Sequence, residues 1–146
     1  MSDDLCRFAI AAFIMSISSC AIAEGTNKLE FKIDQVLVRL EEHSGLCFAI
    51  APTLKNKTQA YDLGIPWPCD FHRNMEGSVR IIQGQGYSYL LVESSKHQPD
   101  APRDCETHLR AIRATNSKLE VSQHKDVVTS CPPFQWDTIM FTELFD

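Results

Sequence analysis

The sequence lacks any block of basic residues. Its 146 residues carry 14 Lys and Arg against 19 Asp and Glu, which gives a formal net charge of −5. A nucleic-acid-binding surface needs clustered cations that pair with phosphates, so nucleic acid is a poor candidate partner. After residue 23 the sequence also lacks any apolar run near the roughly 18 residues that a membrane-spanning helix needs. We therefore predict no membrane span.

Recognisable catalytic motifs are missing as well. No Gly-x-Ser-x-Gly nucleophile elbow occurs, and Gly84-Gln85-Gly86 has neither the third glycine nor the lysine of a phosphate-binding loop. Covalent haem attachment would need Cys-x-x-Cys-His, which is absent. We accordingly expect a protein that uses no cofactor and is not an enzyme. A small exported hydrolase with an unrecognised site around His72 and Asp70 is kept as an alternative.

What the chain does have is an N-terminal segment with the pattern of an export signal. Phe8 to Ile17 is apolar except for Ser16, and Ala21-Ile22-Ala23 supplies the small-x-small pattern that signal peptidases accept. This pattern predicts a signal peptide over residues 1–23. It also predicts one exported globular domain over residues 24–146, secreted or periplasmic, of ordinary domain size.

Two modifications are compatible with export. Ile17-Ser18-Ser19-Cys20 loosely resembles a bacterial lipobox, so attachment of a lipid anchor at Cys20 is an alternative to simple cleavage. Asn56-Lys57-Thr58 matches the triplet for N-glycosylation, which applies only in a eukaryotic secretory route.

The exported domain would contain four cysteines, at Cys47, Cys69, Cys105 and Cys131. An even number of cysteines in an exported domain predicts disulfides. The sequential pairing is favoured because Cys47–Cys69 would close a proline-rich loop and Cys105–Cys131 would enclose a hairpin. The two crossed pairings stay open.

The same residues allow a metal site. Cys69-Asp70-Phe71-His72 and Cys105-Glu106-Thr107-His108 are both Cys-x-x-His pairs. Two such pairs can build a tetrahedral Cys2His2 zinc site. Because an oxidising compartment favours disulfides, a metal-binding protein that uses Cys69, His72, Cys105 and His108 is only an alternative.

Apolar spacing predicts an α+β domain. Leu29, Ile33, Val36, Leu37 and Leu40 recur at three and four residues, which favours an N-terminal helix, although the alternation of Leu29, Phe31 and Ile33 also fits a short strand. Proline followed by a dense cluster of apolar residues predicts a C-terminal helix over 134–144.

Between these helices we expect a mostly antiparallel sheet of four to five strands. A strand at 46–50 comes first, and residues 53–76 are expected to be irregular because of their glycine and prolines. Hairpins follow at 78–94, with a turn at 84–86, and at 108–123. The apolar runs Ile81-Ile82 and Leu90-Leu91-Val92 predict strands that are covered on both faces.

Aromatic residues provide the candidate binding surface. Trp67 lies in a proline-rich segment, and Tyr87 and Tyr89 alternate onto one face of a strand, where rigid aromatic side chains are common binding anchors. The leading hypothesis is therefore an exported, non-catalytic binding protein that acts on a protein partner in the envelope or extracellular space, such as an inhibitor or immunity-type protein. The 61–73 loop, fixed by Cys69, would insert into a cleft of that partner. An accessory component of an envelope or secretion assembly differs from this hypothesis only in its partner.

Overall fold

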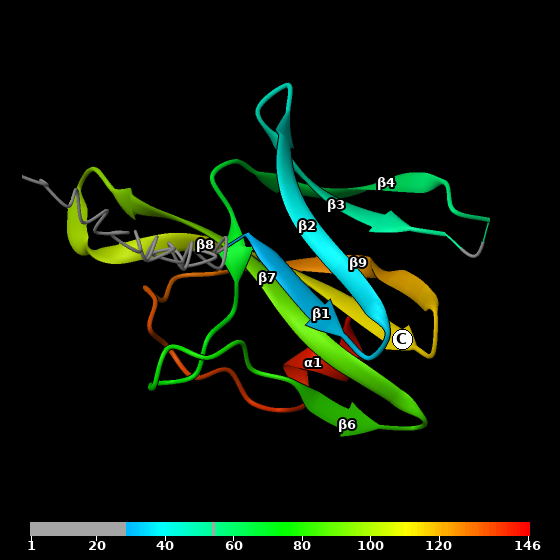
Figure 1. Cartoon of the computed structure of the whole chain (residues 1–146). Coiled ribbons are helices and arrows are strands. Elements are labelled where there is room, and N and C mark those ends of the chain that lie inside the picture. Colours follow the sequence, from blue (N-terminus) through cyan, green and yellow to red (C-terminus); the bar gives the residue numbers. More distant parts are fainter. Residues whose placement is uncertain (1–28, 54) are drawn as a thin grey trace, which may run out of the picture.

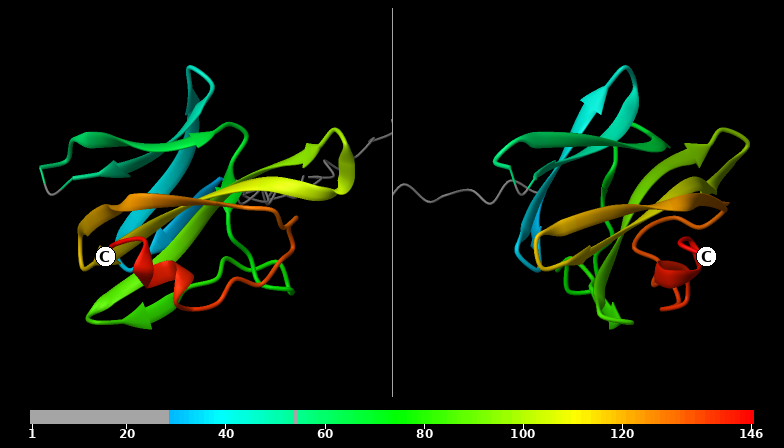
Figure 2. Two further views of the ribbon diagram at one scale, coloured as in Figure 1. Left: turned by 180° about the vertical axis from the view of Figure 1, so that it is seen from behind. Right: turned by 90° about the vertical axis from the view of Figure 1, so that its right-hand side faces the viewer.

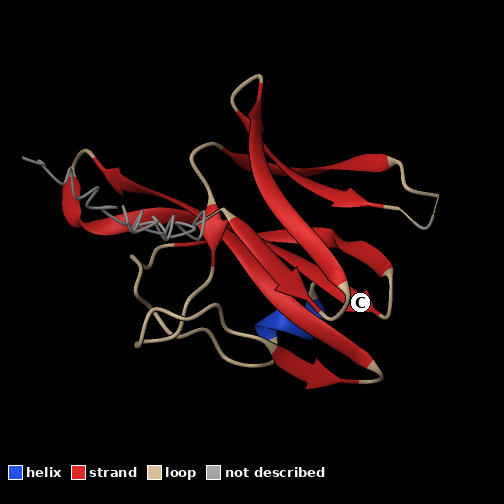
Figure 3. Cartoon of the chain, viewed as in Figure 1, coloured by secondary structure: helices blue, strands red, loops and turns tan. Residues whose placement is uncertain are grey.

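The domain is a sandwich of two antiparallel sheets (Figure 1). The computed structural model describes residues 29–146 except residue 54. The predicted signal peptide and Cys20 lie outside the described residues. Nearly all regular structure is strand (Figure 3), so the expected α+β class is wrong.

The first sheet has the order β1-β2-β3-β4 and is built from consecutive hairpins. Its strands are β1 (Glu30–Ile33), β2 (Val36–His43), β3 (Leu46–Pro52) and β4 (Thr58–Pro66). The β2–β3 turn is tight because Ser44 and Gly45 both have positive φ, 53° and 79°, as hairpin turns of this kind require.

The second sheet has β7 (Tyr87–Gln98) near its centre, paired along one edge with β8 (Ala101–Thr115), which in turn pairs with β9 (Lys118–Val128). Two short strands, β5 (Asp70–Phe71) and β6 (Ile82–Gly84), pair with the other edge of β7. The predicted turn is present at Gln85 and Gly86, whose φ values are 50° and 79°.

The expected N-terminal helix is replaced by β1 and β2. Val36, Val38 and Leu40 alternate into the core, whereas Leu37, which contributed to the helical spacing, is 49% exposed. Asp34 has a φ of 51° in the turn between the two strands. The spacing of three and four residues therefore arose from two short runs of alternation on either side of a turn.

The expected C-terminal helix is reduced to the four residues of α1 (Met140–Glu143). The final segment, residues 129–146, instead runs across the second sheet on the face opposite the first sheet (Figure 2). The molecule therefore has three layers: the first sheet, the second sheet and this final segment.

Two apolar cores lie between the three layers. Leu90 and Val92 of β7 face the first sheet, while Tyr89 and Leu91 face the final segment. Residues 90–92 have no measurable exposure, so the prediction that this run is covered on both faces is confirmed. Trp136, Phe141 and Leu144 supply the outer side of the second core.

The segment expected to be irregular, 53–76, contains β4 and β5. Polar, exposed side chains at the start of β4 and Gly64 within it conceal the strand pattern, as is common at a sheet edge. The second hairpin is longer than predicted, because β8 begins at Ala101 and β9 ends at Val128. In the first hairpin β7 extends to Gln98, but the strand expected at 78–83 is reduced to the three residues of β6.

Both disulfides form in the sequential pairing. Cys47–Cys69 joins β3 to the connection that enters the second sheet, and Cys105–Cys131 joins β8 to the start of the final segment. Each disulfide therefore links two adjacent layers. Two disulfides are more typical of exported proteins than of cytosolic ones. Within residues 29–146, as far as they are described, no helix is long and apolar enough to cross a membrane.

Candidate functional site

A pocket of about 530 Å³ lies where the start of the second sheet meets the start of the final segment. Its lining comes from three parts of the chain that are distant in sequence. These are the connection through β5, strand β7 and the residues after Cys131, which contribute Pro68, Cys69, Asp70, Phe71, Arg73, Glu93, Ser95, Pro132 and Pro133.

The two disulfides hold the two opposite walls of this pocket. Cys69 is itself part of the lining, and Cys131 directly precedes Pro132 and Pro133. Each wall is thereby linked covalently to a long strand, β3 or β8. Ordering the walls in advance lowers the entropy that would be lost when a ligand binds.

Two carboxylates lie side by side in the pocket. Asp70 of β5 is the register partner of Glu93 of β7, and directly opposed side chains on antiparallel strands share one face. Like charges in this position destabilise a sheet. Asp70 is compensated, because its Oδ1 lies 3.4 Å from Nη2 of Arg73.

Glu93 is held differently, by two aromatic rings. Its Oε2 lies 3.1 Å from Nδ1 of His72 and accepts a hydrogen bond of 2.9 Å from Nε1 of Trp136. The Glu93 side chain is only 11% exposed. Among the described residues, no Lys or Arg forms an ion pair with it. The pocket therefore contains a largely buried carboxylate that is oriented by two ring nitrogens.

His72 lies beneath this carboxylate. Its side chain is 1% exposed and packs against the rings of Trp136 and Phe141, with centroid separations of 6.4 and 6.0 Å. Its Nε2 is buried and has no hydrogen-bond partner among the described residues. The hydroxyl group of Ser95, which lines the pocket, instead forms a hydrogen bond of 2.6 Å with the hydroxyl group of Thr107. No hydroxyl nucleophile is thus joined to this histidine.

Exposed apolar side chains come directly after two of the segments that line the pocket. Met75, two residues after Arg73, is 72% exposed, and Phe134, directly after Pro133, is 47% exposed. The two segments touch, because Nε2 of Gln135 donates a hydrogen bond of 3.2 Å to the carbonyl of Arg73. We call Met75 and Phe134 the pocket rim.

The three aromatic residues predicted as binding anchors are not brought together. Tyr87 and Tyr89 do share a face, with centroids 6.1 Å apart, but Tyr89 is 1% exposed because Phe145 of the final segment packs on it. Tyr87 is half-buried beneath the guanidinium of Arg113. Trp67 packs against the core between the two sheets and lies next to the pocket only through its neighbour Pro68.

The four residues of the alternative zinc site are also separated. Cys69 and Cys105 belong to different disulfides, and His72 contacts Glu93. Nε2 of His108 lies 2.8 Å from Oε1 of Glu106.

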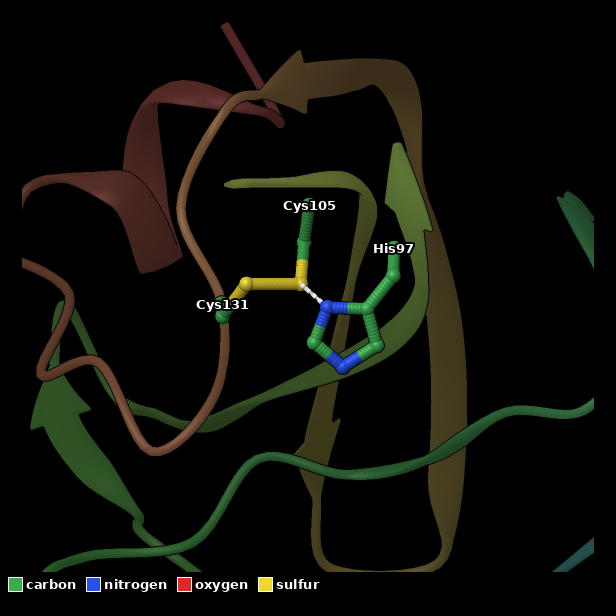
Figure 4. A group of neighbouring side chains, drawn as sticks. All are labelled: His97, Cys105 and Cys131. Carbon is green, nitrogen blue, oxygen red and sulfur yellow. Dashed lines mark hydrogen bonds between the residues drawn. A yellow bond between two sulfur atoms is a disulfide. The ribbon is translucent and has the colours of Figure 1, made fainter. Parts of the chain in front are cut away.

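The structure brings together a different set of metal-type ligands, His97, Cys105 and Cys131 (Figure 4). Nδ1 of His97 lies 3.7 Å from Sγ of Cys105. Both sulfur atoms are in the disulfide, so neither is present as the thiolate that a metal requires.

Asn56, the predicted glycosylation site, lies in the turn between β3 and β4, where its backbone has a φ of 55°. This turn is at the opposite end of β3 from Cys47 and the pocket. Its side chain is exposed.

Comparisons with other proteins do not assign the chain to a family. No family model matches it, and neither a curated protein nor a solved structure is significantly similar to it.

The sequence interpretation missed Glu93 and Arg73. One local signal was present for Glu93, because it is a charged residue directly after the apolar run 90–92, in a strand covered on both faces. A charge in that position must have polar partners or remain exposed. The identity of those partners depends on long-range pairing.

Proposed function

We propose that this domain is an exported, non-catalytic binding protein that receives part of a protein partner in the pocket between β5, β7 and the final segment. One observation carries the proposal: a preformed pocket has each wall fixed by a disulfide, and the segments that form these walls continue into exposed Met75 and Phe134. Exposed apolar side chains beside an ordered pocket are typical of protein-binding surfaces. The partner would be an envelope or extracellular protein, as for an inhibitor or immunity-type protein.

In this proposal the partner inserts into the domain, and not the domain into the partner. Residues 61–73 belong to β4, β5 and their connection, so they do not form a loop that could enter a cleft of the partner. The partner would instead insert a side chain into this domain. Phe134 and Met75 would contact the surface around that side chain.

Binding is favoured over hydrolysis by the surroundings of His72. A general base must reach the proton that it removes, but Nε2 of His72 is buried and unpartnered, and Ser95 is bonded to Thr107.

Site-specific photocrosslinking in the native host tests the proposal. A photoreactive amino acid would be placed at Met75 or at Phe134 on the pocket rim. The matched control is Lys55, an exposed residue of the β3–β4 turn at the other end of the first sheet. We expect the same crosslinked product from both rim positions and none from position 55.

Competition makes the test specific. Purified wild-type domain in excess should abolish the crosslink, whereas folded Phe134→Ala should compete at least about tenfold less well, as expected for loss of a binding anchor. The proposal is wrong if position 55 crosslinks and the rim positions do not, or if Phe134→Ala competes as well as the wild type.

A further inference from the structure

The carboxylate of Glu93 is largely buried and forms no ion pair with a Lys or Arg in the part of the chain that the structure describes. The two groups that contact its Oε2, Nδ1 of His72 and Nε1 of Trp136, are ring nitrogens. Nε2 of His72 is buried without a hydrogen-bond partner among the described residues, so this ring offers Glu93 only its Nδ1.

The neighbouring acid increases this imbalance. Asp70 is directly opposite Glu93 in the β5–β7 register, and its one cationic partner in the pocket lining is Arg73. Arg73 also donates a hydrogen bond of 3.1 Å from Nη1 to the carbonyl of Gly77, so its guanidinium is oriented toward Asp70 and its own loop. With two carboxylates and one guanidinium, the pocket has an excess negative charge.

The rest of the lining defines the kind of cation that would fit. Pro68, Phe71, Pro132 and Pro133 form apolar walls, and the volume of about 530 Å³ far exceeds that of a bare ion. A calcium ion would need six to eight oxygen ligands, and two side-by-side carboxylates supply too few. An aliphatic stem that ends in an ammonium or guanidinium group matches both the walls and the charge.

We propose that the pocket binds a cationic side chain, lysine or arginine, of the protein partner, and that Glu93 is the residue that pairs with its charge. This inference rests on the proposed binding function and names the chemistry of the inserted group. Glu93 would present Oε1 to the ligand, while His72 and Trp136 hold Oε2. Asp70 would add the second negative charge at the side of the ligand.

The two tryptophans of the chain provide the assay. Nε1 of Trp136 donates directly to Glu93, so its indole N–H resonance in an NMR spectrum should move when a cation binds that carboxylate. The indole of Trp67 packs against the core between the sheets and serves as an internal reference. The probes are N-acetyl-arginine amide and N-acetyl-lysine amide, with the neutral isostere N-acetyl-citrulline amide as the control.

We expect saturable shifts of the Trp136 resonance with the arginine or lysine probe, and none with citrulline. Glu93→Gln, which keeps an acceptor for Trp136, should weaken binding at least about tenfold, as for the loss of a charge-assisted hydrogen bond. Glu76→Gln, an exposed acid outside the pocket lining, should bind as the wild type does. High salt should weaken binding.

Three results would overturn the inference. They are equal shifts with citrulline, undiminished binding by folded Glu93→Gln, and a response to Ca²⁺ with none to either amino-acid probe. The citrulline comparison needs only the wild-type protein, so it decides the question even if Glu93→Gln does not fold. If the rim crosslinks persist while the cation probes fail, the binding function stands and only the cationic ligand is wrong.

Discussion

Removing the two disulfides one at a time should have unequal effects, although their loops are nearly equal. The bonded residues are 22 and 26 positions apart in sequence. Loop-closure entropy then gives a stabilisation of about 3.4 kcal/mol for Cys47–Cys69 and about 3.5 kcal/mol for Cys105–Cys131. On loop length alone, the two double alanine variants would lose the same free energy of unfolding.

Burial separates the two variants. Cys47 and Cys69 are both part of the core between the sheets, whereas Cys131 at the start of the final segment is partly exposed. Replacing the core pair by alanine also removes two buried sulfur atoms, which adds roughly 2 kcal/mol through lost burial and residual cavity. The Cys105→Ala/Cys131→Ala variant also loses one buried sulfur atom, because Cys105 is 2% exposed. We therefore expect Cys47→Ala/Cys69→Ala to be the less stable variant by roughly 1 kcal/mol.

Urea unfolding of both variants measures this difference, and hydrogen exchange locates it. In the Cys105→Ala/Cys131→Ala protein, amides that pack under the final segment, such as that of Leu91, should lose more protection than Leu40 of the first sheet. Equal midpoints for the two variants, or a less stable Cys105→Ala/Cys131→Ala protein, would refute the reasoning from burial. Equal loss of protection at Leu91 and Leu40 would contradict the link between Cys105–Cys131 and the final segment.

Three further outcomes are expected. Leu37→Lys should change stability by less than about 0.5 kcal/mol, because the side chain faces solvent. Val38→Lys should unfold the domain, because it buries a charge. Thermal melts followed by circular dichroism measure both effects, and this contrast between neighbouring residues is expected for a strand and not for the helix. The hydrogen bonds from Lys118 and then Arg113 lower the pKa of Glu120, so this carboxylate stabilises the fold above its ordinary pKa and the contribution is lost as the pH falls through the lowered value. Glu120→Gln should therefore cost up to about 1 kcal/mol at pH 7. The cost should disappear at a pH below the lowered pKa, where the carboxyl group is protonated in both the folded and the unfolded state. Thermal melts across this pH range measure the difference. Finally, the intact mass of the mature protein should begin at Glu24 and be about four hydrogens lower than that of the reduced chain; a mass that begins at Met1 would contradict the export signal.

The sequence contained enough information for the centre of the second sheet. Leu90, Leu91 and Val92 form an apolar run too short for a helix, and Gly86 next to Gln85 permits the tight turn before it. These features are local, and the structure confirms them. The favoured disulfide pairing also followed from short sequence separations.

The prediction of an N-terminal helix was wrong for a physical reason. Apolar residues in two strands that are separated by a two-residue turn are spaced so that Ile33, Val36 and Leu40 also fit one face of a helix. Only Val38, which is fully buried, and Leu37, which is half-exposed, distinguish the two patterns. The prediction of a C-terminal helix over 134–144 was wrong for a different reason. The apolar residues of the final segment are required to cover β7 and β8, whether or not they form a helix.

The pocket could not be predicted from local sequence. The pairing of β5 with β7 brings its two carboxylates together, although Asp70 and Glu93 are far apart in sequence. Its second wall is formed by Pro132 and Pro133, which are more distant still. β5 has only two residues, too few to show any periodicity. Trp136 was expected to be buried, but its role as a hydrogen-bond donor to Glu93 depends on tertiary packing.

The position of the final segment has a consequence for how the chain reaches its native state. A polypeptide is synthesised from its N-terminus, so all nine strands are available before the residues that cover the outer face of the second sheet. Until Phe141 and Leu144 have emerged, Leu91 and Leu109 have no cover on that face. A chain that stalls or is cut near residue 130 would present an apolar sheet surface of the kind that causes aggregation. The outer core can thus form only after residues 129–146 have followed the strands that they cover.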